Sequence, residues 1–209
     1  ATDDIVRWSI APELPGALEL GDELSKRGII ASVAHTDAVC SEVIEAFGHG
    51  YELMTHFYSA MSSATRRNAY RYAGAVEAGY LLDGMKVEII VDGIHLPKEL
   101  LQLIYKVKGV DNIILITDAM RGAGMPDGNY LLGSLEKGQE VLVEDGVAKL
   151  LDRSAFAGSV ATADRLVRVM TQLAGVPLVE AIQMLTLNPA KLLRIEDKKG
   201  HLALGKDAD

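Results

Sequence analysis

Short apolar runs alternate with amphipathic stretches along the first part of the chain. Runs of mainly Val, Ile, Leu and Ala predict strands at 5–11, 29–34, 51–55, 86–91 and 112–117. The intervening periodicity predicts helices at 17–27, 37–47 and roughly 70–78, and one that has Pro97 at its N1 position. Thr36 or Asp37 is the expected N-cap of the second helix. Continuous apolar strands separated by helices indicate parallel βαβ units covered on both faces.

A polar residue follows each of these predicted strands. They are Glu13, His35, His56, Asp92 with His95, and Asp118. In a TIM barrel the carboxyl ends of the strands build the active site. In a doubly wound sheet the same ends border the ligand crevice. The pattern therefore predicts an α/β fold with a site at this edge, and it leaves both architectures open.

The pattern changes after Asp118. Residues 128–152 are rich in turns and in alternating polar and apolar positions, and Asp145-Gly146 between two apolar runs predicts a β-hairpin. Helical periodicity resumes at 162–173, 177–185 and around 189–193. We therefore expect four segments: barrel strands and helices at 1–127, a small antiparallel β excursion at 128–152, closing helices at 153–195, and a return toward a β-sandwich at 196–209.

The two strand-end histidines are the first candidates for chemistry. Neutral imidazole is a common ligand of zinc and similar metals, so His35 and His56 could approach one ion from neighbouring strands. A carboxylate at Asp118 could take a proton from an attacking water. Each also has an ordinary structural explanation, as a histidine bonded to a loop carbonyl or an aspartate capping a turn.

Other polar positions are weaker candidates by spacing alone. His95 could bind a sugar hydroxyl or phosphate, although Asp92-Gly93 also fits a simple turn. Arg66 and Arg67 could bind phosphate, or form a solvated basic loop. The segment Phe156 to Ser159 precedes a predicted helix, where backbone N–H groups bind anions, or where the helix merely begins.

Composition excludes some classes of protein. A formal net charge of -8 argues against non-specific binding to nucleic acid. Cys40 is the only cysteine, which rules out an intrachain disulfide and a cysteine-rich zinc site and fits a reducing, cytoplasmic location. The longest apolar runs are well below the ~20 residues that span a bilayer, and no signal-peptide pattern begins the sequence, so we expect no membrane association.

Five strings taken together resemble a known family. AHTDA, THFYSAM, DGIH, ITDAM and FAGS occur in the order found in the N-acetylglucosamine-6-phosphate deacetylases of the amidohydrolase superfamily. The ending LNPAKLLRIEDKKGHLALGKDAD is similar to the close of many amidohydrolases. The resemblance implies a TIM (β/α)8 barrel of the metal-dependent hydrolase type, of which this chain holds the later strands and part of a small β-sandwich.

The resemblance also implies residue roles, a reaction and partners. It makes His35 and His56 metal ligands and Asp118 both a metal ligand and the catalytic acid/base. The substrate-binding residues it implies are Ser59, Ala60, Arg67 (for phosphate), Asp92, Gly93, His95, Phe156, Ala157 and Gly158. The implied reaction releases acetate from N-acetyl-D-glucosamine 6-phosphate with a divalent metal, zinc first, with iron, manganese or cobalt as alternatives. The implied assembly is a homodimer.

Departures from the family keep other readings open. The family's metal-binding glutamate, in a string like HLEGP, and its HxH pair are not present here. Glu13 lies in a different string and is therefore a poor third ligand. The family usually has Asn at Ser59 and Arg-Glu-Pro-Gly at 67–70. The alternatives are an amidohydrolase for a different N-acetylated sugar, or a truncated, non-catalytic barrel that binds a sugar phosphate.

Overall fold

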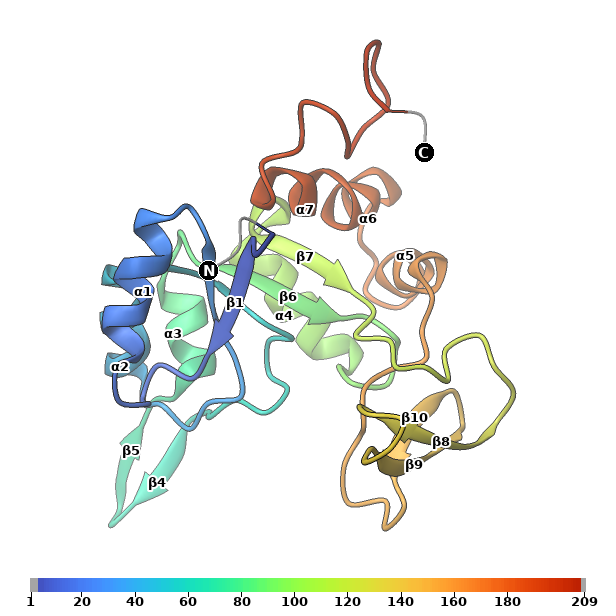
Figure 1. Cartoon of the computed structure of the whole chain (residues 1–209), viewed down its shortest axis with the longest axis horizontal. Helices are drawn as coiled ribbons and strands as arrows, with labels where there is room; N and C mark the ends of the chain where they lie inside the picture. The colour runs from blue at the N-terminus through green and yellow to red at the C-terminus, as the bar shows by residue number, and fades with distance from the viewer. Residues whose placement is uncertain (1–3, 208–209) are drawn as a thin grey trace.

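The computed structural model describes residues 4–207 and has a five-stranded parallel sheet at its centre (Figure 1). The strand order is the order along the chain: β1 (Arg7–Ile10), β2 (Ile30–Val33), β3 (Tyr51–Met54), β6 (Lys86–Ile90) and β7 (Ile113–Ile116). All four neighbouring pairs are parallel. The strand order does not reverse in this sheet, so the switch point that defines a doubly wound sheet is absent from the described residues.

Helices connect the successive strands of this sheet. They are α1 (Ala17–Lys26), α2 (Cys40–Gly48), α3 (Ala75–Leu81) and α4 (Lys98–Lys108), followed by the 3-10 turn η1 (Val110–Asn112). Alternate strand residues such as Val87 and Ile89 belong to one large hydrophobic core together with Leu101 and Ile104 of α4. The opposite face of the sheet holds a smaller cluster of Ile30, Leu53, Ile114 and Leu192. The α/β class is therefore confirmed.

The main error in the predicted elements lies between β3 and α3. The helix expected at 70–78 begins only at Ala75, and residues before it form an antiparallel hairpin, β4 (Thr65–Arg67) and β5 (Tyr70–Tyr72). The two turn residues, Asn68 and Ala69, both have positive φ, at 48° and 71°, as in a tight two-residue hairpin turn. The hairpin projects from the body of the molecule (Figure 1).

Two predicted helix starts were also wrong. Pro97 is the N-cap of α4, with ψ of 160°, because its backbone is still extended at that point. The helix α2 begins at Cys40 with Val39 as its N-cap, not at Thr36 or Asp37. The Thr36 hydroxyl instead accepts a hydrogen bond from the backbone N–H of Ala38, which holds the loop in a non-helical turn.

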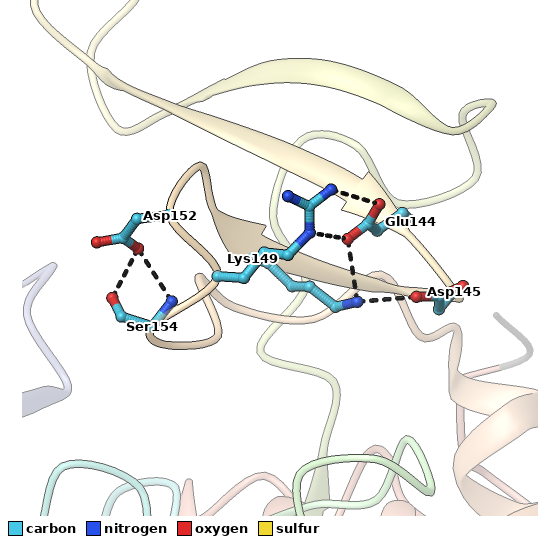
Figure 2. A network of polar contacts seen from close by, with 6 residues as sticks. Glu144, Asp145, Lys149, Asp152 and Ser154 are labelled. Carbon is cyan, nitrogen blue, oxygen red and sulfur yellow. Dashed lines mark hydrogen bonds and ion pairs between the residues drawn. The ribbon is translucent and has the colours of Figure 1, made fainter.

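The predicted hairpin at Asp145-Gly146 is confirmed. Strands β8 (Gly128–Leu132), β9 (Gln139–Glu144) and β10 (Val147–Leu150) form an antiparallel sheet in the order β10-β9-β8. Asp145 and Gly146 have φ of 54° and 76°, which suits a two-residue turn. Val141, Val143 and Ala148 pack on Met120 and Ala157, so this sheet has a small core of its own. Charged side chains, including Glu144 and Lys149, form a network on the hairpin (Figure 2).

Three helices complete the chain: α5 (Ala163–Gln172), α6 (Leu178–Leu185) and α7 (Leu187–Leu192). Residues 193–207 contain turns and coil but no strand. The predicted β-sandwich at 196–209 and the division into four segments stay predictions, and positions 1–3 and 208–209 of those segments lie outside the described residues. Within 4–207, none of the helices has the length and apolar character needed to cross a membrane.

Candidate metal and substrate site

His35, His56 and Asp118 occupy equivalent positions in the sheet. Each is the second residue after the last residue of its strand, β2, β3 and β7 respectively. All three have positive φ, at 47°, 35° and 47°. A left-handed backbone costs a non-glycine residue of order 1–3 kcal/mol, and such residues cluster at functional sites. The shared strain therefore makes this edge of the sheet a candidate site.

The two imidazoles meet at this edge. Nε2 of His35 lies 2.9 Å from Nε2 of His56, and the rings are 4.6 Å apart at 78°. Zinc–imidazole bonds are about 2.0–2.1 Å long, so nitrogens at this separation can share one ion. The sequence suggested that the two histidines could approach one ion, and the structure brings their Nε2 atoms together.

His56 is the more enclosed of the pair, with 7% of its surface exposed. Burial lowers the pKa of its imidazole and the neighbouring His35 lowers it further, while Asp118 acts in the opposite direction. The neutral ring is the form that binds metals. Its Nδ1 is buried and has no hydrogen-bond partner among the described residues.

A cavity of about 650 Å³ opens beside the histidines. Nine of its lining residues were candidates from the sequence: His35, His56, Ser59, Ala60, His95, Asp118, Phe156, Ala157 and Gly158. Its other lining residues were not foreseen: Ile90, Ala119, Met120, Leu132 and Ala155. These residues are apolar, so nothing in the sequence indicated a functional role. They line the cavity because they neighbour strand ends or lie in or near the small antiparallel sheet.

Asp92 reaches the cavity only through His95. Its side chain is buried, and Oδ2 lies 2.7 Å from Nδ1 of His95. Its Oδ1 accepts hydrogen bonds of 2.8 Å from the backbone N–H groups of Ile94 and His95. Burial alone would raise the pKa of this carboxyl, but the bonds from His95 and Ile94 outweigh it and lower the pKa. Asp92 therefore holds the proton of His95 on Nδ1 and leaves Nε2 available. Gly93 is exposed and does not line the cavity.

Segment 156–159 is tied directly to the loop of Asp118. The backbone N–H of Ser159 donates to the carbonyl of Asp118 at 2.8 Å, and the N–H of Met120 donates to the carbonyl of Ser159 at 2.8 Å. These bonds bring the Phe156 ring to 4.7 Å from the His95 ring. The small antiparallel sheet thus forms one wall of the cavity.

Glu13 is a loop-holding residue in this structure. Its carboxylate accepts a 2.5 Å hydrogen bond from the Thr36 hydroxyl and a 2.8 Å bond from the backbone N–H of Asp37. Thr36 in turn bonds through its backbone to Ala60. Glu13 therefore fixes the loop next to His35.

Arg67 does not line the cavity. It is exposed on the β4–β5 hairpin, where its guanidinium carbon lies 5.7 Å from the centre of the Tyr72 ring. The predicted loop around Arg67 is instead part of an exposed hairpin that includes residues 65–72. The role of Arg67 in phosphate binding stays a prediction.

The donor set fits part of a metal site. Two imidazole nitrogens converge and Asp118 shares their cavity, but the described residues contain no group of three His, Cys, Asp or Glu side chains placed to hold an ion. This agrees with the absence from the sequence of the family's glutamate and HxH strings.

The sequence profile of the amidohydrolase family matches residues 6–209. An N-acetylglucosamine-6-phosphate deacetylase of Lysinibacillus sphaericus is 40% identical over 205 residues, which are 98% of this chain and 50% of that protein. An N-acetylgalactosamine-6-phosphate deacetylase of Escherichia coli O157:H7 is 34% identical over 200 residues, 96% of this chain and 50% of that protein. The chain thus spans about half the length of these relatives.

The solved structures that this chain resembles are also deacetylases of this kind. The N-acetylglucosamine-6-phosphate deacetylase of Pasteurella multocida superposes with a TM-score of 0.88 at 30% identity, covering 99% of this chain and 52% of that one. A mutant of the Mycobacterium smegmatis enzyme, in complex with N-acetyl-D-glucosamine 6-phosphate, also gives 0.88 at 33% identity, covering 98% and 52%. The resemblance found in the five sequence strings is confirmed, and the chain belongs to the amidohydrolase family.

Proposed function

We propose that the complete protein carrying this chain hydrolyses the acetamide of N-acetyl-D-glucosamine 6-phosphate to D-glucosamine 6-phosphate and acetate. The observation that carries this proposal is the meeting of His35, His56 and Asp118 at one cavity. Relatives at 40% and 36% identity bear the name of this deacetylase.

The amidohydrolase family is metal-dependent. His35 and His56 would hold the ion through Nε2, and zinc is the first choice because imidazole nitrogen suits it, with iron, manganese and cobalt as alternatives. When bound, such an ion supplies Lewis-acid polarisation of the amide carbonyl and acidifies water. The further ligands would come from the part of the polypeptide beyond this chain.

Asp118 is the proposed acid and base. Its carboxylate takes a proton from the water whose oxygen bonds to the acetamide carbon. It then gives that proton to the sugar nitrogen as the C–N bond breaks, which releases an amine and acetate. Its exposed side chain at the cavity wall suits both transfers.

The rest of the cavity would bind the sugar. Ser59, Ala60, His95 and the segment 156–158 line it, and Asp92 with Gly93 shape the loop of His95. The oxygen-rich ring of a hexosamine suits a site with a few polar groups on an otherwise apolar wall.

We propose a homodimer in which Arg67 contacts the phosphate in the cavity of the second copy. The exposed hairpin, with Tyr70 73% and Tyr72 45% exposed, supports an interface there. Guanidinium groups bind phosphate through paired N–H donors, so this placement would restore the role that Arg67 lacks within one copy.

We further propose that the five parallel strands are part of a (β/α)8 barrel. Their sequential order matches consecutive strands of such a barrel, and the relatives are about twice as long. Segment 128–152 would then be an insertion, 153–195 the closing helices, and 196–209 the return to a β-sandwich. The single cysteine, Cys40, is a free thiol, which suits the cytoplasm.

The test is acetate release by the complete protein with a divalent metal. We expect turnover of N-acetyl-D-glucosamine 6-phosphate and a slower reaction with the sugar lacking phosphate. The absence of acetate from every N-acetylhexosamine 6-phosphate, with zinc, iron, manganese or cobalt supplied, would reject the proposal.

A further inference from the structure

A polar network crosses the face of the sheet opposite the main helical core. Arg7 of β1 bonds both carboxylate oxygens of Glu88 in β6, at 2.6 and 2.7 Å. The same guanidinium donates to Thr55 Oγ1 at 2.6 Å. Ser32 and Ser9 place their hydroxyls 2.7 and 3.2 Å from Thr55 Oγ1. Side chains of β1, β2 and β6 and the residue that follows β3 are thus joined.

The centre of this network is shielded from water. The Glu88 side chain is 5% exposed, and that of Arg7 is 29% exposed. Burial raises the pKa of Glu88, Arg7 opposes the rise, and the negative charge of Asp118 adds to it. The network also borders the site by geometry, because Thr55 immediately precedes His56 in the chain.

This ion pair is poorly suited to stabilising the fold alone. The Nε of Arg7 is buried without a hydrogen-bond partner among residues 4–207. A buried ion pair repays its desolvation only when its remaining donors are satisfied, and apolar replacement of such pairs is often neutral or stabilising. A role in positioning neighbouring residues is therefore the better explanation for the pair of Arg7 and Glu88.

Both neighbours of His56 are held by hydrogen bonds, one through the network and one through the backbone. Thr55, immediately before it, is bonded by Arg7 through its side chain. Phe57, immediately after it, donates its backbone N–H to the carbonyl of Glu88 at 2.6 Å. The side-chain pair of Arg7 and Glu88 therefore acts on His56 through Thr55, and the backbone of β6 holds it through Phe57.

His56 needs this support for two reasons. Its φ of 35° is strained and persists only where the surroundings impose it. A metal-binding histidine usually has its second nitrogen oriented by a hydrogen bond, but Nδ1 of His56 has no partner in the described part of the chain. The backbone groups of His56 and Ser59 act on its ring only enough to raise its pKa, so the hydrogen bonds to its two neighbours carry much of its orientation.

We infer that Arg7 and Glu88 are positioning residues that hold His56 in its metal-binding orientation through Thr55. This inference rests on the proposed metal site, and it assigns these two residues no direct contact with metal or substrate.

The test replaces the pair by apolar residues of similar size, Arg7→Met with Glu88→Leu, in the complete protein. A matched control, Arg27→Met with Glu23→Leu, removes an Arg–Glu pair of similar length, 2.6 Å, between α1 and its C-cap residue. Zinc affinity is measured by competition with a chelator, and metal-free thermal unfolding is measured in parallel.

We expect the Arg7/Glu88 variant to bind zinc about tenfold more weakly, at the lower end of the ~10–100-fold range for changes next to metal ligands, because the backbone bond of Phe57 remains. Its unfolding temperature should stay near that of the parent. The surface control should leave zinc affinity unchanged. Glu88→Gln keeps the shape of the side chain but removes its charge, and it should also weaken zinc binding. This single variant provides the test if the double variant does not fold.

Zinc affinity equal to the parent in both Arg7/Glu88 and Glu88→Gln variants would overturn the inference. His56→Ala separates this outcome from failure of the proposed function. If the parent binds zinc and His56→Ala does not, the metal site stands and only the positioning role is lost. If the parent itself binds no zinc, the proposed function fails and the inference fails with it.

Discussion

Nε2 of His35 and Nε2 of His56 lie 2.9 Å apart although 21 positions separate the two residues in the chain. The parallel pairing of β2 with β3 produces this contact, since each histidine follows its strand by the same number of residues. Asp118 has the same relation to β7. Repetition of one strand-to-loop geometry places all three side chains at one cavity.

Replacing Asp118 by Asn tests its role in proton transfer. The amide keeps the size of the carboxylate but cannot accept the proton, so we expect kcat to fall by roughly 10²–10⁴-fold with little change in KM. Steady-state acetate release measures both constants. A kcat within twofold of the parent would remove Asp118 from the mechanism.

Asp92→Asn tests the orientation of His95. An amide nitrogen facing Nδ1 would favour the opposite tautomer and leave Nε2 protonated, so sugar binding should weaken. We expect KM for the phosphorylated sugar to rise about tenfold, the equivalent of one hydrogen bond of ~1.4 kcal/mol. Asp22→Asn, which alters a second Asp–His pair, with His49, outside the cavity lining, is the matched control. An unchanged KM in Asp92→Asn would mean that His95 does not contact the substrate.

The low pKa of Asp92 also has a consequence for stability. The pKa of Asp92 is lowered in the folded state. Its ionised carboxylate therefore adds to the free energy of unfolding above the unfolded pKa of about 3.9, and this stabilisation is lost as pH falls through the folded pKa.

The charged network on the β9–β10 hairpin offers a test of pH dependence (Figure 2). Hydrogen bonds from Arg153 and then from Lys149 lower the pKa of Glu144 to about 2. The ion pairs of Glu144 with Arg153 and Lys149 should therefore stabilise the hairpin above the unfolded pKa of Glu144, roughly 4.3. This stabilisation should be lost as pH falls toward 2. We expect Arg153→Ala to move the Glu144 pKa up toward 4.5 in an NMR titration of its carboxyl carbon.

Asp152 supplies an internal control in the same titration. Its pKa is lowered by hydrogen bonds from Ser154, not from Arg153, and should stay low in Arg153→Ala. A Glu144 pKa that already stands near 4.5 in the parent protein would contradict the network.

Arg67→Ala tests the proposed phosphate contact. The ratio of kcat/KM for the phosphorylated over the unphosphorylated sugar should fall by roughly tenfold or more, as for a lost hydrogen bond to a charged group. Arg71, which pairs with Arg66 across the same hairpin, gives the control Arg71→Ala, which should leave the ratio unchanged. Preserved preference in Arg67→Ala, or a monomer in light scattering of the parent, would count against the contact between copies.

Much of the site could be predicted because it depends on strand ends. An apolar run followed by His35 or His56 specifies both the strand and the position of the polar residue beyond it, and parallel pairing then brings such positions together. Arg67 could not be placed in this way. It was expected in a loop, and its actual position depends on the hairpin of β4 and β5, which turns at the left-handed residues Asn68 and Ala69.

The contact between Arg7 and Glu88 could not be predicted from the sequence, for a different reason. Its members are 81 positions apart and lie inside runs whose apolar neighbours dominate the pattern. Single polar residues within predicted strands carry no indication of a partner. Only the register of β1, β2, β3 and β6 shows that they share a face.

The most direct test of the shared histidine site is anomalous diffraction at the zinc edge from crystals of the complete protein grown with zinc. One strong peak bonded to Nε2 of both His35 and His56, with the Asp118 carboxylate at the same cavity, is the predicted result. Zinc bound elsewhere, or the two imidazoles turned away from a common ion, would contradict it.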